Sequence, residues 1–306
     1  MKEILLVIAP LFLIILLGAF LERLKIADER WSHVLNEFAL KIGFPALIFA
    51  ALTGTRFNLS LQLDLIAANS AFLIGSFLLA GLIAKILKLD TKNLRTLFIT
   101  LGFGNVAYLG IPTLVQIRGE AILPVASLIV AVYLFWMFTI GIGFLEYWQS
   151  GKKHVTKNIL GHLIKNPLLV AVIIGLLVAG LQIPIPGILN QSINMIAASV
   201  TPIVLIVIGL FIGRSEFGSI KKWLPSLAFS MISLMLLPAF FYYGVILAGE
   251  PAREFSTSII QAAMPLAITP FALADMYKLN KKFIARSIVM STILSIITIP
   301  FWTSLV

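Results

Sequence analysis

Proline and glycine residues recur along this chain at a constant distance of about half its length. The recurring pairs are Pro10 and Pro167, Gly18 and Gly175, and Pro45 and Pro202, each 157 positions apart, and Pro112 and Pro270, 158 positions apart. Because proline and glycine set where a helix bends or packs closely, a shared spacing of both indicates two copies of one structural unit. We expect the two units at residues 1–150 and 155–306.

The composition places both units in a membrane. The mean hydropathy is +1.04 and 12% of the residues are charged, against about 25% in soluble domains. Ten apolar runs are each long enough to cross a bilayer. They cover residues 3–21, 32–53, 63–86, 96–117, 122–148, 164–182, 189–213, 223–248, 256–276 and 283–304. The sequence therefore predicts an all-α integral membrane protein with ten transmembrane helices.

Five helices in each unit mean that the second unit enters the membrane from the opposite side, which gives a 5+5 inverted repeat. Most of the 23 Lys and Arg fall in the loops after odd-numbered helices, whereas the other loops and the termini hold only Lys2, Arg56, Arg118 and Arg253. Positive residues stay on the cytoplasmic side, so both termini are predicted outside the inner (cytoplasmic) membrane of a cell. The net charge of +10 thus reflects topology and predicts no nucleic-acid partner.

Two of the ten segments are predicted to be broken near the middle of the membrane. The fourth carries Gly104, Gly110 and Pro112, and the ninth carries Pro265 and Pro270. Proline removes a backbone donor and glycine removes side-chain restraint. Unwound backbone inside a bilayer is tolerated only where it is buried in protein or lines a cavity. A matched pair of breaks therefore points to a transport site.

The chemistry at the two breaks leaves the sign of the bound charge open. Asn105 and Thr269 lie there as neutral polar groups. The half-helices that begin near Pro112 and Pro270 direct their N-termini to the membrane centre, and free N–H groups at such ends suit a carboxylate. The half-helices before the breaks present carbonyl groups to the same place, so the site could equally coordinate a cation.

Three motifs connect the chain to a known family. They are Gly104-Asn105-x-x-x-x-Gly110-x-Pro112, Phe44-Pro45-Ala46-Leu47-Ile48-Phe49 and Ala262-Ala263-Met264-Pro265. These motifs resemble signatures of the auxin efflux carrier family, whose bacterial members include malonate and malate permeases. The resemblance covers the whole chain. It implies broken helices that cross, in an architecture similar to that of bile-acid symporters and Na⁺/H⁺ antiporters.

The resemblance also assigns roles. It implies a scaffold of helices one, two, six and seven, a transport domain of helices three to five and eight to ten, and a homodimer formed through the scaffold. It further implies that Asn105 contacts a substrate carboxylate, while many relatives have an asparagine where this chain has Thr269 in the second break. The expected substrate-binding residues are Asn105, Tyr108, Gly110, Pro112, Pro265, Thr269, Pro270 and Lys41.

Two ionisable residues lie inside the second segment. Glu37 and Lys41 are four residues apart, a spacing that brings side chains together on a helix. One interpretation is a mutually neutralised pair that stabilises this helix. The other makes Lys41 a supplementary anion ligand, or makes the pair a charge switch, because charges within the membrane are costly and mark functional sites.

The leading hypothesis is a secondary transporter that moves a small organic anion, such as a carboxylate or an auxin-like acid, by alternating access. The alternative is a Na⁺- or H⁺-coupled symporter of the bile-acid type. A cation antiporter is less favoured because the breaks carry no carboxylate. The chain has no cysteine, and its histidines, His33, His154 and His162, lack ligand-spaced partners. We therefore expect no enzyme activity, resident cofactor or metal site, although Na⁺ or H⁺ could be a coupling ion.

Overall fold

The computed structural model describes residues 2–53, 59–150, 155–215 and 220–306, and these residues fold into helices. The α-helices are α1 (Lys2–Arg23), α2 (Glu29–Phe38), α3 (Phe44–Thr53), α4 (Leu59–Ile86), α5 (Thr91–Gly102), α6 (Ile111–Arg118), α7 (Leu123–Trp136), α8 (Gly143–Ser150), α9 (Val155–Lys165), α10 (Pro167–Gly180), α11 (Gly187–Arg214), α12 (Leu224–Met231), α13 (Leu237–Leu247), α14 (Ser256–Ala262), α15 (Thr269–Leu273) and α16 (Lys281–Leu305). Of the residues named above, Arg56 and His154 lie outside the described residues.

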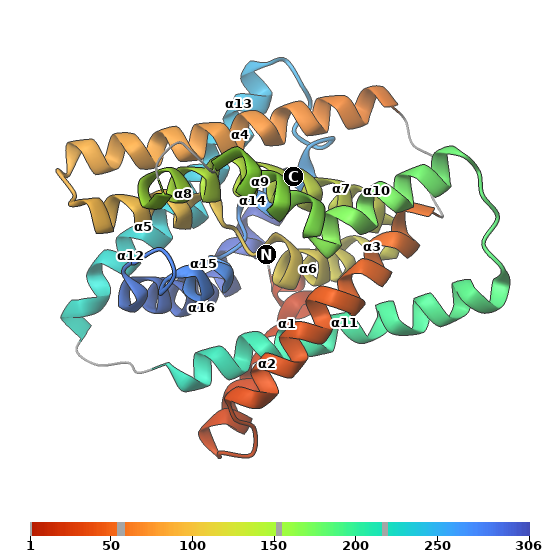
Figure 1. Ribbon diagram of the computed structural model, residues 1–306, viewed down its shortest axis with the longest axis horizontal. Helices are drawn as coiled ribbons and strands as arrows, with labels where there is room; N and C mark the ends of the chain where they lie inside the picture. Colours follow the sequence, from red (N-terminus) through yellow and green to blue (C-terminus); the bar gives the residue numbers. More distant parts are fainter. Residues whose placement is uncertain (1, 54–58, 151–154, 216–219) are drawn as a thin grey trace.

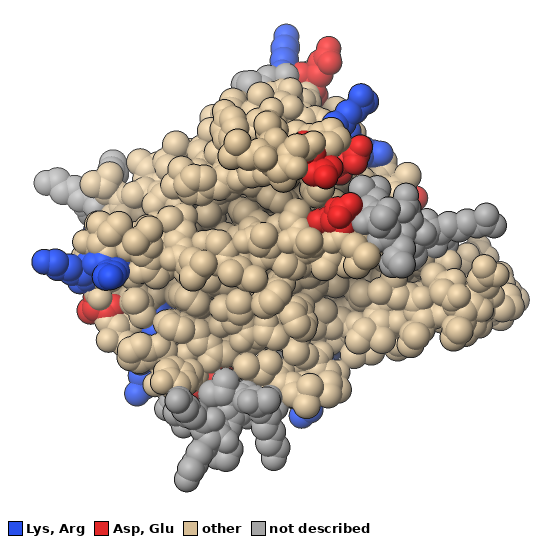
Figure 2. All heavy atoms as spheres, turned by 90° about the horizontal axis from the view of Figure 1, so that it is seen from above, with Lys and Arg blue, Asp and Glu red and all other residues tan. Residues whose placement is uncertain are grey.

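Within the described part of the chain, seven helices are long and apolar enough to span a membrane, or eight if the bent pair α9–α10 is one span. The segments from α5 to α6 and from α14 to α15 are not among them, because a break divides each into short helices. Figure 2 shows a face that is mostly uncharged, with charged side chains in small groups toward its upper right, at its left edge and at its bottom. The prediction of a helical, multi-span membrane protein is confirmed.

Helices α1 and α11 cross at van der Waals distance between backbones. A Cβ atom on Gly18 would lie 2.5 Å from the main-chain oxygen of Ile206, and one on Gly209 would lie 2.1 Å from that of Ile15. Small residues permit such an approach between membrane helices. Helix α3 packs against both α10 and α11. The elements α1, α3, α10 and α11 therefore form one continuous packed group, and α4 runs along the opposite edge in Figure 1.

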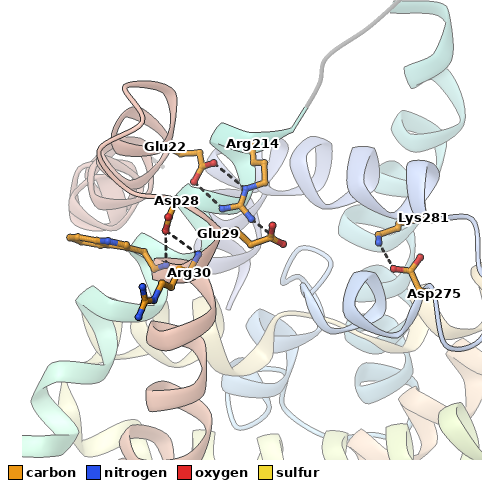
Figure 3. A network of polar contacts seen from close by, with 8 residues as sticks. Glu22, Asp28, Glu29, Arg30, Arg214, Asp275 and Lys281 are labelled. Carbon is orange, nitrogen blue, oxygen red and sulfur yellow. Dashed lines mark hydrogen bonds and ion pairs between the residues drawn. The ribbon is translucent and has the colours of Figure 1, made fainter.

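A polar cluster closes one end of the α1–α11 pair (Figure 3). Arg214 Nε and Nη2 each donate a 3.0 Å hydrogen bond to the carboxylate of Glu22, and Nη1 lies 3.6 Å from Glu29. Asp28 caps α2 by accepting from the N–H groups of Arg30 and Trp31. Bidentate Arg–carboxylate pairs fix the relative orientation of the two side chains. This cluster therefore fixes how α1, α2 and α11 meet.

In the part of the chain that the structure describes, four π-helical turns interrupt the α-helices: η1 (Ala39–Gly43), η2 (Val106–Gly110), η4 (Met137–Ile142) and η6 (Ile232–Leu236). Three of them end two positions before a proline, namely Pro45, Pro112 and Pro238. In each of these three, the residue before the proline donates its N–H to the carbonyl five positions back. A proline has no N–H and its ring clashes with the carbonyl four residues earlier, and the wider turn removes that clash.

Candidate functional site

Both predicted breaks are present in the structure. Helix α5 ends at Gly102, and helix α14 ends at Ala262. Beyond the second break, α15 begins with Pro270 as its second residue, a position where the missing proline N–H costs no helical hydrogen bond. Beyond the first break, the helix resumes at Val106 with the π turn η2, which continues without interruption into α6, so Pro112 lies inside this half-helix. The prediction that a half-helix begins near Pro270 is therefore confirmed, whereas the half-helix predicted to begin near Pro112 begins earlier, at Val106.

The unwound segments of the two breaks cross and pair through their backbones. The N–H of Asn105 donates to the carbonyl of Pro265 at 2.7 Å, and the N–H of Ala267 donates to the carbonyl of Phe103 at 2.9 Å. The two bonds enclose an antiparallel bridge centred on Gly104. Unwound backbone groups inside a membrane protein need partners, and here each break supplies partners for the other.

Asn105 lies at this crossing with its side chain uncommitted. The residue is 5% exposed, and its main-chain carbonyl accepts from the N–H groups of Leu109 (3.3 Å) and Gly110 (2.9 Å). Its side-chain amide forms no hydrogen bond with any described residue. A buried amide offers two donors and an acceptor, and buried polar groups are normally paired. Asn105 is therefore available to a ligand.

Tyr108 connects the first break to the α2–α3 segment. Its hydroxyl donates a 2.6 Å hydrogen bond to the Asn36 side-chain oxygen, and its ring stacks on Phe44 with centroids 5.2 Å apart. On the same segment, Glu37 and Lys41 form an ion pair, and the side chain of Lys41 is 65% exposed. The structure thus brings Glu37 and Lys41 together, but it leaves Lys41 outside the buried crossing.

Gln261 is a candidate that sequence analysis missed. It is completely buried at the end of α14, and neither its amide nitrogen nor its amide oxygen has a partner among the described residues. Its amide packs directly on Gly110, where an added Cβ would lie 2.4 Å from Gln261 Oε1. The available signal was a single long polar side chain directly before the motif Ala262-Ala263-Met264-Pro265.

The chain matches a family model described as membrane transport protein over residues 4–303. It belongs to that family, the auxin efflux carriers. Similar curated proteins are an uncharacterized transporter of Methanocaldococcus jannaschii, 24% identical with 97% of this chain and 96% of the relative covered, and one of Methanothermobacter thermautotrophicus, 26% identical with 97% and 96% covered. A protein of Rhizobium meliloti named "Putative malonate transporter" is 24% identical, with 98% and 94% covered.

The remaining predicted site residues of this auxin efflux carrier family member differ in burial. Pro265 and Pro270 are buried at the crossing, but Thr269 is exposed at the start of α15. A groove of about 920 Å³ lies between α4 and α13, and its lining is mainly apolar and does not include Asn105. The described residues contain no group of three or more His, Cys, Asp or Glu side chains able to hold a metal ion.

Proposed function

We propose that this transporter moves a small organic anion, such as a carboxylate or an auxin-like acid, across the cytoplasmic membrane by alternating access. The observation that carries the proposal is the side-chain amide of Asn105 beside the paired breaks, which has no partner among the described residues although the residue is only 5% exposed. Membrane carriers place substrates near the midplane between broken helices. The name of the Rhizobium meliloti relative, "Putative malonate transporter", adds support for a carboxylate substrate.

In this proposal the substrate carboxylate accepts hydrogen bonds from the amide nitrogen of Asn105. The amide of Gln261, packed on Gly110, becomes a second ligand when the crossing opens, and it takes the role for which exposed Thr269 is poorly placed. The start of the returning half-helix at Val106, directly after Asn105, adds the partial positive charge of a helix N-terminus. Lys41 contributes no direct contact, because it is exposed and paired with Glu37.

We further propose the 5+5 inverted repeat of ten spans, with both termini outside and helices one, two, six and seven as the scaffold. Seven or eight spanning helices plus two broken segments, all within described residues, are compatible with this count. The packed group of α1, α3, α10 and α11 supports the scaffold assignment. Tyr108, which contacts Asn36 and Phe44, would then lie where the moving part slides against the scaffold, and two scaffolds would meet in a homodimer.

The energetics allow two modes of transport. An interior-negative potential favours exit of an anion by about 2.3 kcal/mol per charge per 100 mV, which is sufficient for an efflux uniporter. Import would require coupling to Na⁺ or H⁺, the alternative function. A cation antiporter is less favoured because neither break carries an acidic side chain.

The test is transport of radiolabelled malonate, malate and indole-3-acetate in proteoliposomes with imposed K⁺-diffusion potentials. We expect saturable flux in the wild type and at least about a tenfold loss in Asn105→Ala, the effect of removing a hydrogen bond to a charged group. Asn194→Ala, which truncates an exposed asparagine of α11, is the matched control. Undiminished flux in Asn105→Ala would move the binding site elsewhere.

A further inference from the structure

A small cavity lies directly against the crossing, on the side where α5 and α14 end. Its volume is about 20 Å³, and its lining includes Gly102, Phe103, Tyr133, Ser233, Ala262 and Met264. A cavity needs roughly 10–15 Å³ by this measure to hold one water-sized particle. The space therefore accommodates a single water molecule or one small dehydrated ion, and it is too small for an organic substrate.

The backbone around this cavity is rich in unused carbonyl groups. Helix α14 ends there. The N–H groups of Ala263 and Met264 cap the carbonyls of Ile259, Ile260 and Gln261, but the donors that follow are absent or committed elsewhere. Pro265 has no N–H, the N–H of Leu266 donates to Ser291 Oγ at 3.1 Å, and the N–H of Ala267 donates to Phe103. The carbonyls of Ala262 and Met264 consequently accept no hydrogen bond from the described residues.

The electrostatic field at the cavity favours a cation. Helix C-termini carry partial negative charge, and two of them, the end of α5 at Gly102 and the end of α14 at Ala262, meet at this cavity. In broken-helix carriers, unwound carbonyls and the C-terminal ends of half-helices coordinate Na⁺, whereas N-terminal ends bind the anion. Among the described residues, the lining contains no basic side chain to compensate for these carbonyls.

Two hydroxyl groups complete the set of oxygens. The hydroxyl of Tyr133 has no hydrogen-bond partner among the described residues, although the side chain is almost completely buried. Ser233 Oγ donates to the carbonyl of Ser230 at 3.3 Å, which leaves its lone pairs free. An unpaired buried hydroxyl costs about 1–3 kcal/mol, so Tyr133 is expected to have a partner that is not part of the chain.

We infer that this cavity is a Na⁺ site formed by the main-chain carbonyls of Ala262 and Met264 and the hydroxyls of Tyr133 and Ser233. All four ligands are neutral oxygens, which suits a monovalent cation better than Ca²⁺ or Mg²⁺, whose sites are built around carboxylates. Because the ligands come from the second unwound segment, from α7 and from η6, Na⁺ stabilises the position of the second segment beside the crossing. The role of Na⁺ as a coupling ion rests on the proposed function, but Na⁺ binding does not.

Ligand binding to the native state alone raises thermal stability. The experiment measures the Tm of the purified transporter by tryptophan fluorescence without any organic substrate, while NaCl replaces choline chloride at constant ionic strength. We expect a rise of about 5 °C at saturating Na⁺, with K⁺ giving less than half of that shift.

The variants Tyr133→Phe and Ser233→Ala remove one proposed ligand each while keeping the packing. We expect each to raise the Na⁺ concentration at half-maximal shift by at least about tenfold, the effect of one lost contact to a charged group. Tyr277→Phe is the matched control. It removes another buried hydroxyl, one that donates to Glu146 at 2.6 Å away from the cavity, so basal Tm falls and the Na⁺-dependent shift stays.

Absence of a Na⁺-dependent shift in the wild type would overturn the inference and leave the cavity to a water molecule. An unchanged Na⁺ response in both cavity variants would overturn it as well. A Na⁺-dependent shift that both variants weaken supports the site even if no anion flux is found, in which case the proposed function fails alone. Flux that requires a Na⁺ gradient, with the same loss in both variants, would establish Na⁺ as the coupling ion.

Discussion

The break after α5 and the break after α14 meet in one antiparallel bridge, but they are built differently on either side of it. The first break continues into the π turn η2, which carries Tyr108 toward α2 and α3. The second break leads into α15, and the N–H of Leu266 in this break donates a hydrogen bond to the hydroxyl of Ser291 on α16. The first break therefore contacts α3, which belongs to the packed group of α1, α3, α10 and α11. The second break is instead bonded to α16, which is not part of that group.

This difference indicates how duplicated units acquire separate roles. The first break holds an uncommitted amide, Asn105, and its contacts reach a part of the protein against which it could move. The second break is buried throughout from Ser256 to Ala267. Its main polar side chain, Gln261, packs directly against Gly110. We expect substitutions in the second break to affect stability first and those in the first break to affect transport first.

The largest effect is expected where the two breaks touch. In Gly110→Ala the new Cβ would lie 2.4 Å from Gln261 Oε1, and overpacking of this kind costs about 1–3 kcal/mol. Thermal unfolding should show a lowered Tm, and the double variant Gly110→Ala/Gln261→Ala should recover part of it. Gly75→Ala on α4, where an added Cβ meets no atom within 4 Å, is the control and should lose no stability. Equal Tm values for Gly110→Ala and Gly75→Ala would contradict the close packing of Gln261 on Gly110.

The anchor of the second break is tested by Ser291→Ala. This change leaves the buried N–H of Leu266 without its partner, at a cost of about 1–3 kcal/mol. Ser295→Ala, one turn further along α16, removes a hydroxyl that bonds only its own helix at Thr292, so it should cost less. If both variants unfold at the same temperature, the second break is not anchored through Ser291.

The mobile contact of the first break is tested by Tyr108→Phe. The variant keeps the stacking on Phe44 but loses the hydrogen bond to Asn36, which is worth about 1 kcal/mol. A contact made in one transport state only should change the flux rate by about fivefold for that energy, with little change in Tm. Exposed Tyr243→Phe serves as the control. A lowered Tm with unchanged flux would make Tyr108 a structural residue instead.

The smallest effect is expected for Lys41→Ala. Its side chain is 65% exposed and paired with Glu37 on the same segment, and exposed pairs contribute little to stability. We expect unchanged Tm and an apparent substrate affinity close to wild type in the flux assay. A several-fold rise in KM would restore the interpretation of Lys41 as an anion ligand.

The positions of the breaks could be predicted because their causes are local. Proline lacks a donor and glycine lacks a side chain wherever they stand, so Pro112, Pro265 and Pro270 identified both interruptions. The π turn η2 and the contact between Tyr108 and Asn36 could not be predicted, since they depend on how distant helices pack. Gln261 was missed for the same reason. Its importance comes from burial without a partner, which is a property of the folded chain.

The crossing is held by main-chain hydrogen bonds between Asn105 and Pro265 and between Ala267 and Phe103. Such bonds require a backbone N–H and a carbonyl but no particular side chain. Descendants of one ancestral carrier can therefore exchange the side chains around the crossing, and with them the solute they accept, while the crossing itself is retained. Substrate choice is therefore an evolvable trait of such a backbone crossing, open to relatives that share only about a quarter of their residues with this chain.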